Sequence, residues 1–253
     1  LLYWPPVYPL ALALFIAIGL SAAFATWAVS VVGYTASAWL LAKAARHPAV
    51  ALAGVLAFLH LAFIAGVPFR AWSESAYLPL MLGSLVVMGA AVGSGSARRG
   101  AWLGLLAGAL GGGAMLTRYV GMSLAPALAG AALLAPASEG EEEGTRRNSI
   151  LTALGGMALV VVPWLVRNVV LNARLFGPER PPNTRPLSFI LRYVGASLYF
   201  EFAILLLVFV FVAIGYHIRQ RDPEAAASPE ESRSGALIWG GLICAGAQIA
   251  VLL

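Results

Sequence analysis

The sequence predicts an all-α fold, a polytopic transmembrane helical bundle of about eight spans with one additional short interfacial helix. Two observations carry this prediction. The 253 residues are 60% hydrophobic and only 11% charged, with a mean hydropathy of +0.85, whereas a soluble domain carries roughly 25% charged residues. The apolar residues form successive runs, most of them near the roughly 20 residues that a helix needs to cross about 30 Å of hydrocarbon. We therefore expect residues 1–253 to form a single transmembrane domain.

The apolar runs define the expected helices in chain order. A first apolar piece, residues 9–19, is too short to cross and is expected at the membrane interface. The spans that follow are expected at 23–45, 49–67, 75–93, 101–117, 119–136, 149–168, 189–215 and 236–253. Gly104, Gly108 and Gly112 recur at a spacing that lets two helices approach closely. The chain begins with Leu and stops inside an apolar run, so both ends are expected to be truncated.

The apolar run 101–136 contains one charged residue, Arg118. As a single straight helix this run would be about 54 Å long, far more than a bilayer requires. A break at Arg118 divides it into two legs, and the arginine then lies in the turn of a hairpin. We expect this turn at a membrane face, because a charge at the bilayer centre costs at least about 2.5 kcal/mol.

The basic residues give an orientation and exclude one class of partner. Pairs at 43 and 46, 98 and 99, 146 and 147, and 219 and 221 share one side, which the positive-inside rule assigns to the cytoplasm. No basic face carries interleaved aromatic residues, so nucleic acid is not an expected partner. The expected location is the inner (plasma) membrane, with membrane lipids as partners. The preference for Arg over Lys, with abundant Ala and Gly, suggests a prokaryotic source.

Several polar features are expected to meet at the opposite, outer face. They belong to the segments 3–9, 70–74, 116–119 and 163–168. Arg118 and Arg167 there have two interpretations: anchors that reach lipid headgroups, or clamps whose planar guanidinium holds a phosphate. Glu74 also has two. It can be a favourable charge at a helix N-terminus after Ser73, or it can contact a substrate.

Four segments, in this order, resemble the GT-C superfamily of membrane glycosyltransferases: YWPPVYPLALALFIAIG, SESAYLPLMLGSL, RRGAWLGLLAGALGGGAMLTRYVGMSLAPAL and VVPWLVRNVVLNARLFG. They cover residues 3–177. The nearest branch contains protein O-mannosyltransferases, aminoarabinose transferases and lipopolysaccharide-core galacturonosyltransferases. The resemblance implies a polyprenyl-phosphate-linked sugar as donor and a glycan, lipid or protein acceptor on the outer side of the membrane. It also implies direct displacement at the anomeric carbon, with polyprenyl phosphate as the leaving group.

The resemblance further implies roles for individual residues. Arg118 and Arg167, the latter followed by Asn168, would bind the donor and stabilise the charge of the leaving phosphate. Glu74 would support catalysis. The segment Tyr3, Trp4, Pro5 and Pro6 would shape the place where the donor enters. The family's catalytic Asp belongs to an external loop before the two prolines and is not in this chain, so this fragment is expected to be inactive alone.

Two other functions remain open from the sequence. Helices interrupted by Gly and Pro, with polar residues among them, would also suit a secondary transporter. A non-catalytic membrane subunit would retain the motifs without the catalytic loop. The chain contains no P-loop and no HExxH, GxSxG or dinucleotide-binding pattern, which disfavours an ATP-driven pump or a soluble-type hydrolase. No cofactor is implied, although a divalent metal remains open.

Overall fold

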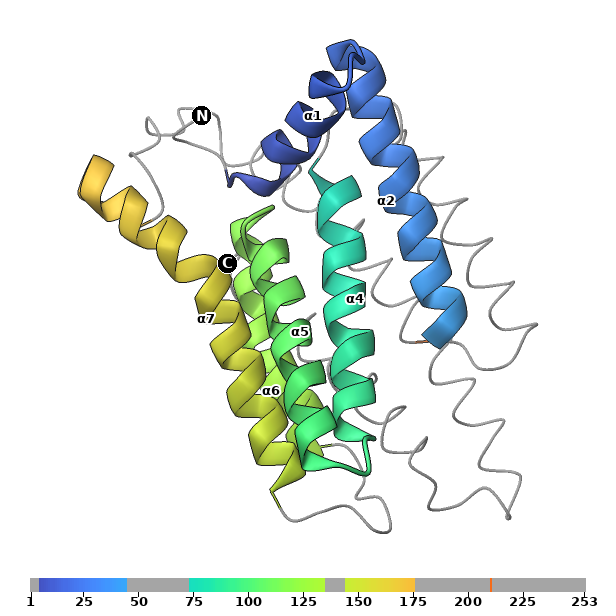
Figure 1. The fold of residues 1–253 in the computed structure, drawn as a ribbon, viewed down its shortest axis with the longest axis vertical. Helices are drawn as coiled ribbons and strands as arrows, with labels where there is room; N and C mark the ends of the chain where they lie inside the picture. Colours follow the sequence, from blue (N-terminus) through green and yellow to red (C-terminus); the bar gives the residue numbers. More distant parts are fainter. Residues whose placement is uncertain (1–4, 45–72, 135–143, 176–209, 211–253) are drawn as a thin grey trace, which may run out of the picture.

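The computed structural model describes residues 5–44, 73–134, 144–175 and 210. Throughout these ranges the regular structure is helical, which confirms the predicted all-α class (Figure 1). The elements, in chain order, are α1 (Val7–Ala17), α2 (Ala22–Ala44), α4 (Glu74–Val92), α5 (Ala97–Met115), the 3-10 helix η2 (Tyr119–Ser123), α6 (Leu124–Leu134) and α7 (Thr145–Asn172).

Three helices in the described ranges are long and apolar enough to cross a membrane: α2, α4 and Thr145–Leu171 of α7. They coincide with the spans expected at 23–45, 75–93 and 149–168. The hairpin expected at 101–117 and 119–136 forms as α5 followed by η2 and α6. Neither leg is a candidate span: α5 contains no 18-residue stretch as apolar as those of the three long helices, and Tyr119–Leu134 is shorter than a spanning helix. The spans expected at 49–67, 189–215 and 236–253 lie outside the described residues. The total of about eight therefore stays a prediction.

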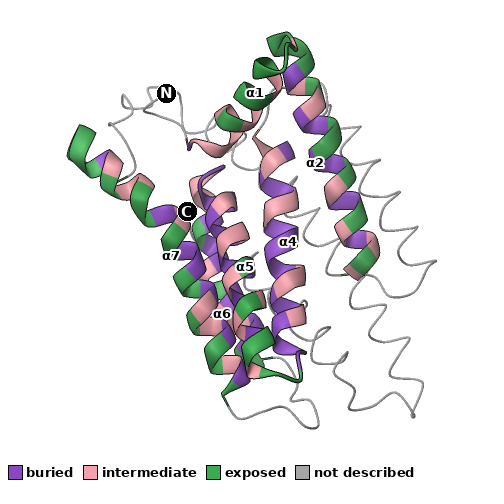
Figure 2. Cartoon of the chain, in the orientation of Figure 1, coloured by how far each residue is buried: buried purple, intermediate pink, exposed green. Residues whose placement is uncertain are grey.

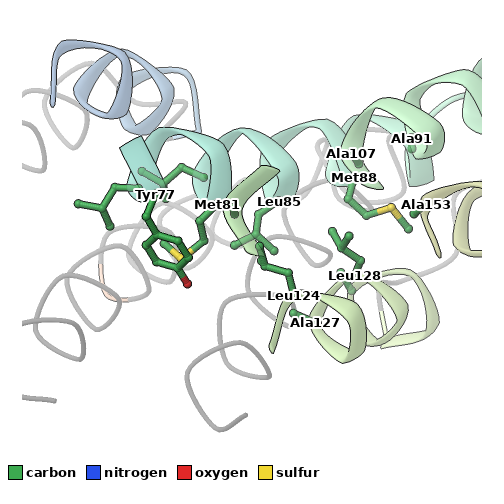
Figure 3. Close-up of a cluster of buried hydrophobic side chains, with 14 of the residues drawn as sticks. Tyr77, Met81, Leu85, Met88, Ala91, Ala107, Leu124, Ala127, Leu128 and Ala153 are labelled. Carbon is green, nitrogen blue, oxygen red and sulfur yellow. The ribbon is translucent and has the colours of Figure 1, made fainter. Parts of the chain in front are cut away.

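The core of the bundle is built around α4, which is buried along most of its length (Figure 2). Tyr77, Met81, Leu85 and Met88 follow one another along α4 at the spacing of one helix face (Figure 3). The side chains that cover this face come from the other helices and include Leu124 and Leu128 of α6, Ala107 of α5 and Ala153 of α7. This arrangement buries the apolar face of α4 whether or not lipid surrounds the bundle.

The predicted glycine face of α5 packs against α7. A β-carbon at Gly104 would lie 2.5 Å from the carbonyl oxygen of Ser149, and one at Gly108 would lie 1.8 Å from that of Ala153. The partners advance along α7 as the glycines advance along α5, so the two helices run parallel. Their C-terminal ends therefore lie at the same end of the bundle, which brings the turn after α5 and the last turns of α7 to one side (Figure 1).

The short helix expected at 9–19 is α1, eleven residues long and without a buried residue. It meets α2 in a V at Gly19, whose φ of +97° is a conformation that glycine adopts without strain (Figure 1). Halfway along α2, Gly33 packs on Ser75, the second residue of α4. The first half of α2, about 16 Å at the rise of an α-helix, therefore extends past the beginning of α4.

Candidate functional site

Glu74 and Arg118 form an ion pair at one end of the bundle. The two residues are 44 positions apart and come from the start of α4 and the turn after α5. Arg118 is extended (φ −148°, ψ 131°) between α5 and η2. Its N–H donates to the carbonyl of Ala114 at 2.9 Å, and its carbonyl accepts from the N–H of Gly121 at 2.9 Å. The turn is therefore held on both sides of the arginine, whose side chain is 28% exposed against 16% for Glu74.

The packing of α4 on α2 determines how far along α2 the Glu74–Arg118 pair lies. The turn follows α5 as expected, but the contact between Gly33 and Ser75 places the beginning of α4 beside the middle of α2. Large apolar side chains remain exposed on α1 and on the first turns of α2, among them Leu14, Phe24 and Trp27. A bilayer that covers all of α2 would enclose the pair, and at that depth a charge is stabilised by an opposite partner.

The last turns of α7 carry the second group of polar side chains. The guanidinium carbon of Arg167 lies 4.5 Å from the centre of the Trp164 ring, a cation–π contact. Asn168 is fully buried and donates from Nδ2 to the carbonyl of Leu175 at 2.9 Å. Three further atoms are buried and have no hydrogen-bond partner among the described residues: Arg167 Nη1, Trp164 Nε1 and Asn168 Oδ1.

A small apolar cluster joins the two groups of polar residues. It consists of Met115 and Leu116 at the end of α5 and Met157 and Val161 of α7, with Val7 and Trp164 packed against it. The N–H of Val7 donates to the carbonyl of Leu116 at 2.9 Å, so the beginning of α1 is attached to the same turn. Glu74, Arg118, Arg167 and Asn168 therefore lie at the same end of the bundle.

The segment with two prolines is also at this end. Pro5 is buried and Pro6 is partly buried directly before α1. Tyr3 and Trp4, the other residues expected to shape the place where the donor enters, lie outside the described residues. In the described ranges no three His, Cys, Asp or Glu side chains gather as a metal site would require.

Two side chains at this end were not among the expected site residues. Trp164 stacks on Arg167. Its position three residues before the arginine places both on one helix face, so the sequence spacing could have identified it as a neighbour of Arg167. Tyr8 lies on the first turn of α1. Burial raises the pKa of its phenol, against the lowering effect of the Thr26 hydroxyl, and the charge of Glu74 raises that pKa further. Tyr8 therefore stays protonated at neutral pH and is a hydrogen-bond donor near the ion pair.

The two arginines differ in their electrostatic state. The charge of Arg118 is offset by the carboxylate of Glu74. Arg167 has an aromatic ring as its neighbour, and no carboxylate contacts it among the described residues. An anion that reaches this end of the bundle is therefore attracted more strongly by Arg167 than by Arg118, because Glu74 repels it from the latter.

Compared with known proteins, the chain matches no family model, no curated protein and no solved structure.

Proposed function

We propose that the chain belongs to a membrane glycosyltransferase of the GT-C type, which transfers a sugar from a polyprenyl-phosphate donor to a glycan, lipid or protein acceptor. The outer face of a prokaryotic inner membrane is the proposed location. The observation that carries the proposal is the cationic Arg167, whose buried Nη1 has no hydrogen-bond partner among the described residues. It lies at the same end of the bundle as the Glu74–Arg118 pair and the segment Pro5–Pro6.

Arg167 is suited to hold the phosphate of the donor. Its guanidinium offers a planar set of donors that matches phosphate oxygens, and stacking on Trp164 restricts its orientation. When the bond between the anomeric carbon and the phosphate oxygen breaks, negative charge increases on the phosphate. A cation held in an apolar layer stabilises that charge more strongly than a hydrated cation does.

Arg118 and Glu74 have a supporting role in this proposal. The acceptor oxygen attacks the anomeric carbon, polyprenyl phosphate leaves with the bonding electrons, and a carboxylate takes the acceptor proton. The resemblance assigns that last step to an Asp before the two prolines, and Glu74 is therefore proposed to orient the reactants. Arg118 holds the Glu74 carboxylate in position and contributes a second, partly compensated positive charge.

One observation favours a different function, secondary transport. The Glu74–Arg118 pair lies level with the middle of α2, and transporters bind their substrates near the centre of the membrane. A transporter would use the pair to contact a substrate or a coupling ion rather than as part of a transfer site. The two functions differ in a measurable way, because only the transferase consumes a polyprenyl-phosphate sugar.

The test uses the product of the full-length gene in proteoliposomes that contain polyprenyl-phosphate [14C]mannose, [14C]glucose or [14C]aminoarabinose. We expect one of these sugars to move to an acceptor and expect Arg167→Ala to lower the rate by about 10²–10³-fold, the usual effect of removing one donor to a developing anion. Arg147→Ala, an exposed arginine in the first turn of the same helix, is the control. Transfer that survives Arg167→Ala would refute the phosphate role, and solute uptake without any transfer would support transport instead.

A further inference from the structure

The last turns of α7 contain more unpaired hydrogen-bonding atoms than one phosphate-binding arginine explains. Besides Arg167 Nη1, the indole Nε1 of Trp164 and the Oδ1 of Asn168 are buried, and neither has a hydrogen-bond partner among the described residues. A buried polar atom without a partner loses its hydrogen bonds to water and gains none in return. Three such atoms within five residues, on a helix with apolar residues on both sides, indicate a ligand that satisfies them together.

We propose that Trp164 and Asn168 complete the lipid site of Arg167: Trp164 donates its indole N–H to the phosphate, and Asn168 accepts a hydrogen bond from a sugar hydroxyl. The proposal rests on the proposed function, since it assigns the donor lipid to these atoms. It gives Trp164 a direct contact with the substrate in addition to its stacking on the guanidinium.

The spacing of the three residues supports a common ligand. Positions 164, 167 and 168 lie one turn apart, on one face of α7. Trp164 is held from behind by the apolar cluster of Met115, Leu116, Met157 and Val161. Its ring therefore has a fixed position, and the guanidinium of Arg167 stacks at 4.5 Å from it. Two N–H donors from neighbouring side chains can thus point to one anion.

The orientation of Asn168 gives the site a second property. Its Nδ2 donates to the carbonyl of Leu175 at 2.9 Å, and its buried Oδ1 is the side-chain atom that has no hydrogen-bond partner among the described residues. An amide oxygen accepts hydrogen bonds and cannot donate one, so it does not favour a phosphate oxygen. It matches a hydroxyl next to the phosphate, as a sugar phosphodiester carries. The substrate then gains a hydrogen bond that the product, bare polyprenyl phosphate, lacks.

The test measures binding of two probes to the full-length protein in nanodiscs: bare polyprenyl phosphate and polyprenyl-phosphate mannose. Trp164→Phe keeps an aromatic ring for Arg167 but removes the N–H. We expect this variant to bind both probes up to about tenfold more weakly, the effect of one lost hydrogen bond. Trp102→Phe is the control, because Trp102 is 65% exposed on α5. Asn168→Ala is expected to weaken the mannosyl lipid and leave the bare lipid unchanged.

A spectroscopic measurement separates direct contact from a structural role. In ¹⁵N-labelled protein, bare polyprenyl phosphate is expected to shift one indole N–H resonance downfield, and that resonance is expected to be absent from Trp164→Phe. If the wild type binds the bare lipid while Trp164→Phe binds equally well, or if no indole resonance that Trp164→Phe lacks shifts, the assignment of Trp164 is wrong. If Asn168→Ala weakens both lipids equally, the assignment of Asn168 is wrong. If the wild type binds neither lipid, the proposed function fails before this inference is reached.

Discussion

Gly33 of α2 packs so closely on Ser75 of α4 that a β-carbon at Gly33 would lie 1.8 Å from the Ser75 carbonyl oxygen. Pro79 stands four residues after Ser75 in α4 and has no N–H to donate to that oxygen. At this contact, the turn of α4 in which Pro79 removes one N–H faces a glycine of α2. Glycine permits so short an approach because it has no β-carbon. Because Glu74 precedes Ser75, this contact also sets the position of the ion pair relative to α2.

Gly33→Ala is expected to push α2 away from α4 and to destabilise the protein by about 1–3 kcal/mol, as overpacking of a tight contact does. Thermal unfolding in nanodiscs measures the effect. Gly155→Ala in α7 is the matched control, since no atom beyond its chain neighbours and its own helix backbone lies within 4 Å of the place where its β-carbon would be. That substitution is expected to be neutral or to stabilise by up to about 1 kcal/mol through helix propensity. Equal effects of the two changes would contradict the role given to the Gly33 contact.

The Glu74–Arg118 pair is expected to show energetic coupling. Glu74→Gln and Arg118→Gln each leave a charge without its partner, and the double variant removes both charges. We expect a coupling free energy of about 0.5–3 kcal/mol from a double-mutant cycle. The side chains of Arg118 and Glu74 are 28% and 16% exposed, and partial exposure weakens an ion pair, so the lower part of that range is expected. Arg147→Gln with Glu74→Gln is the control cycle, because Arg147 is exposed at the other end of the bundle. Additive effects for Glu74 and Arg118 would show that the pair contributes no net stability.

Pro163 is expected to control the position of Arg167. It lies inside α7 and cannot donate to the carbonyl of Leu159, and the C-terminal part of this helix leans away from the bundle (Figure 1). Pro163→Ala restores the missing N–H, so it is expected to stabilise α7 while it redirects the turn that carries Trp164 and Arg167. The expected result is a higher unfolding temperature together with weaker binding of polyprenyl phosphate. Unchanged binding in a stabilised variant would show that the bend does not serve the site.

The end of α7 offers a test of backbone strain. Ala173 follows the helix with φ 55° and ψ 23°, a left-handed conformation that L-residues other than glycine adopt at a cost of roughly 1–2 kcal/mol. Ala173→Gly is expected to stabilise the protein by up to about 1 kcal/mol, part of the relief being offset by the greater freedom of glycine in the unfolded chain. At the other end of the helix, Gly144 has φ 93°, a conformation that strains an alanine even though no atom beyond its chain neighbours lies within 4 Å of its β-position. Gly144→Ala is therefore expected to destabilise, and unfolding temperatures of both variants check the two signs.

Only part of the candidate site was predictable from the sequence. The lone arginine in the run 101–136 predicted a break at Arg118, because a charge is costly among apolar residues and the run is too long for one span. The sequence predicted that the segments of Glu74 and Arg118 meet at one face, but not that these two side chains pair, since 44 positions separate them in the chain. Glu74 is the first residue of α4, where a carboxylate is favourable, but Ser73 makes no side-chain cap there, and the structure adds the pairing with Arg118.

The sequence by itself determined the local properties of this protein: helices rather than strands, their apolar character, the break near Arg118 and the glycine face of α5. These depend on residue type and spacing within one segment. The tertiary structure alone decided that Arg118 is paired while Arg167 stacks on Trp164, and that the pair lies beside the middle of α2. The physical reason is that helix packing sets the relative height of the segments, through contacts such as that of Gly33 with Ser75, and neighbouring residues in the chain do not encode that height.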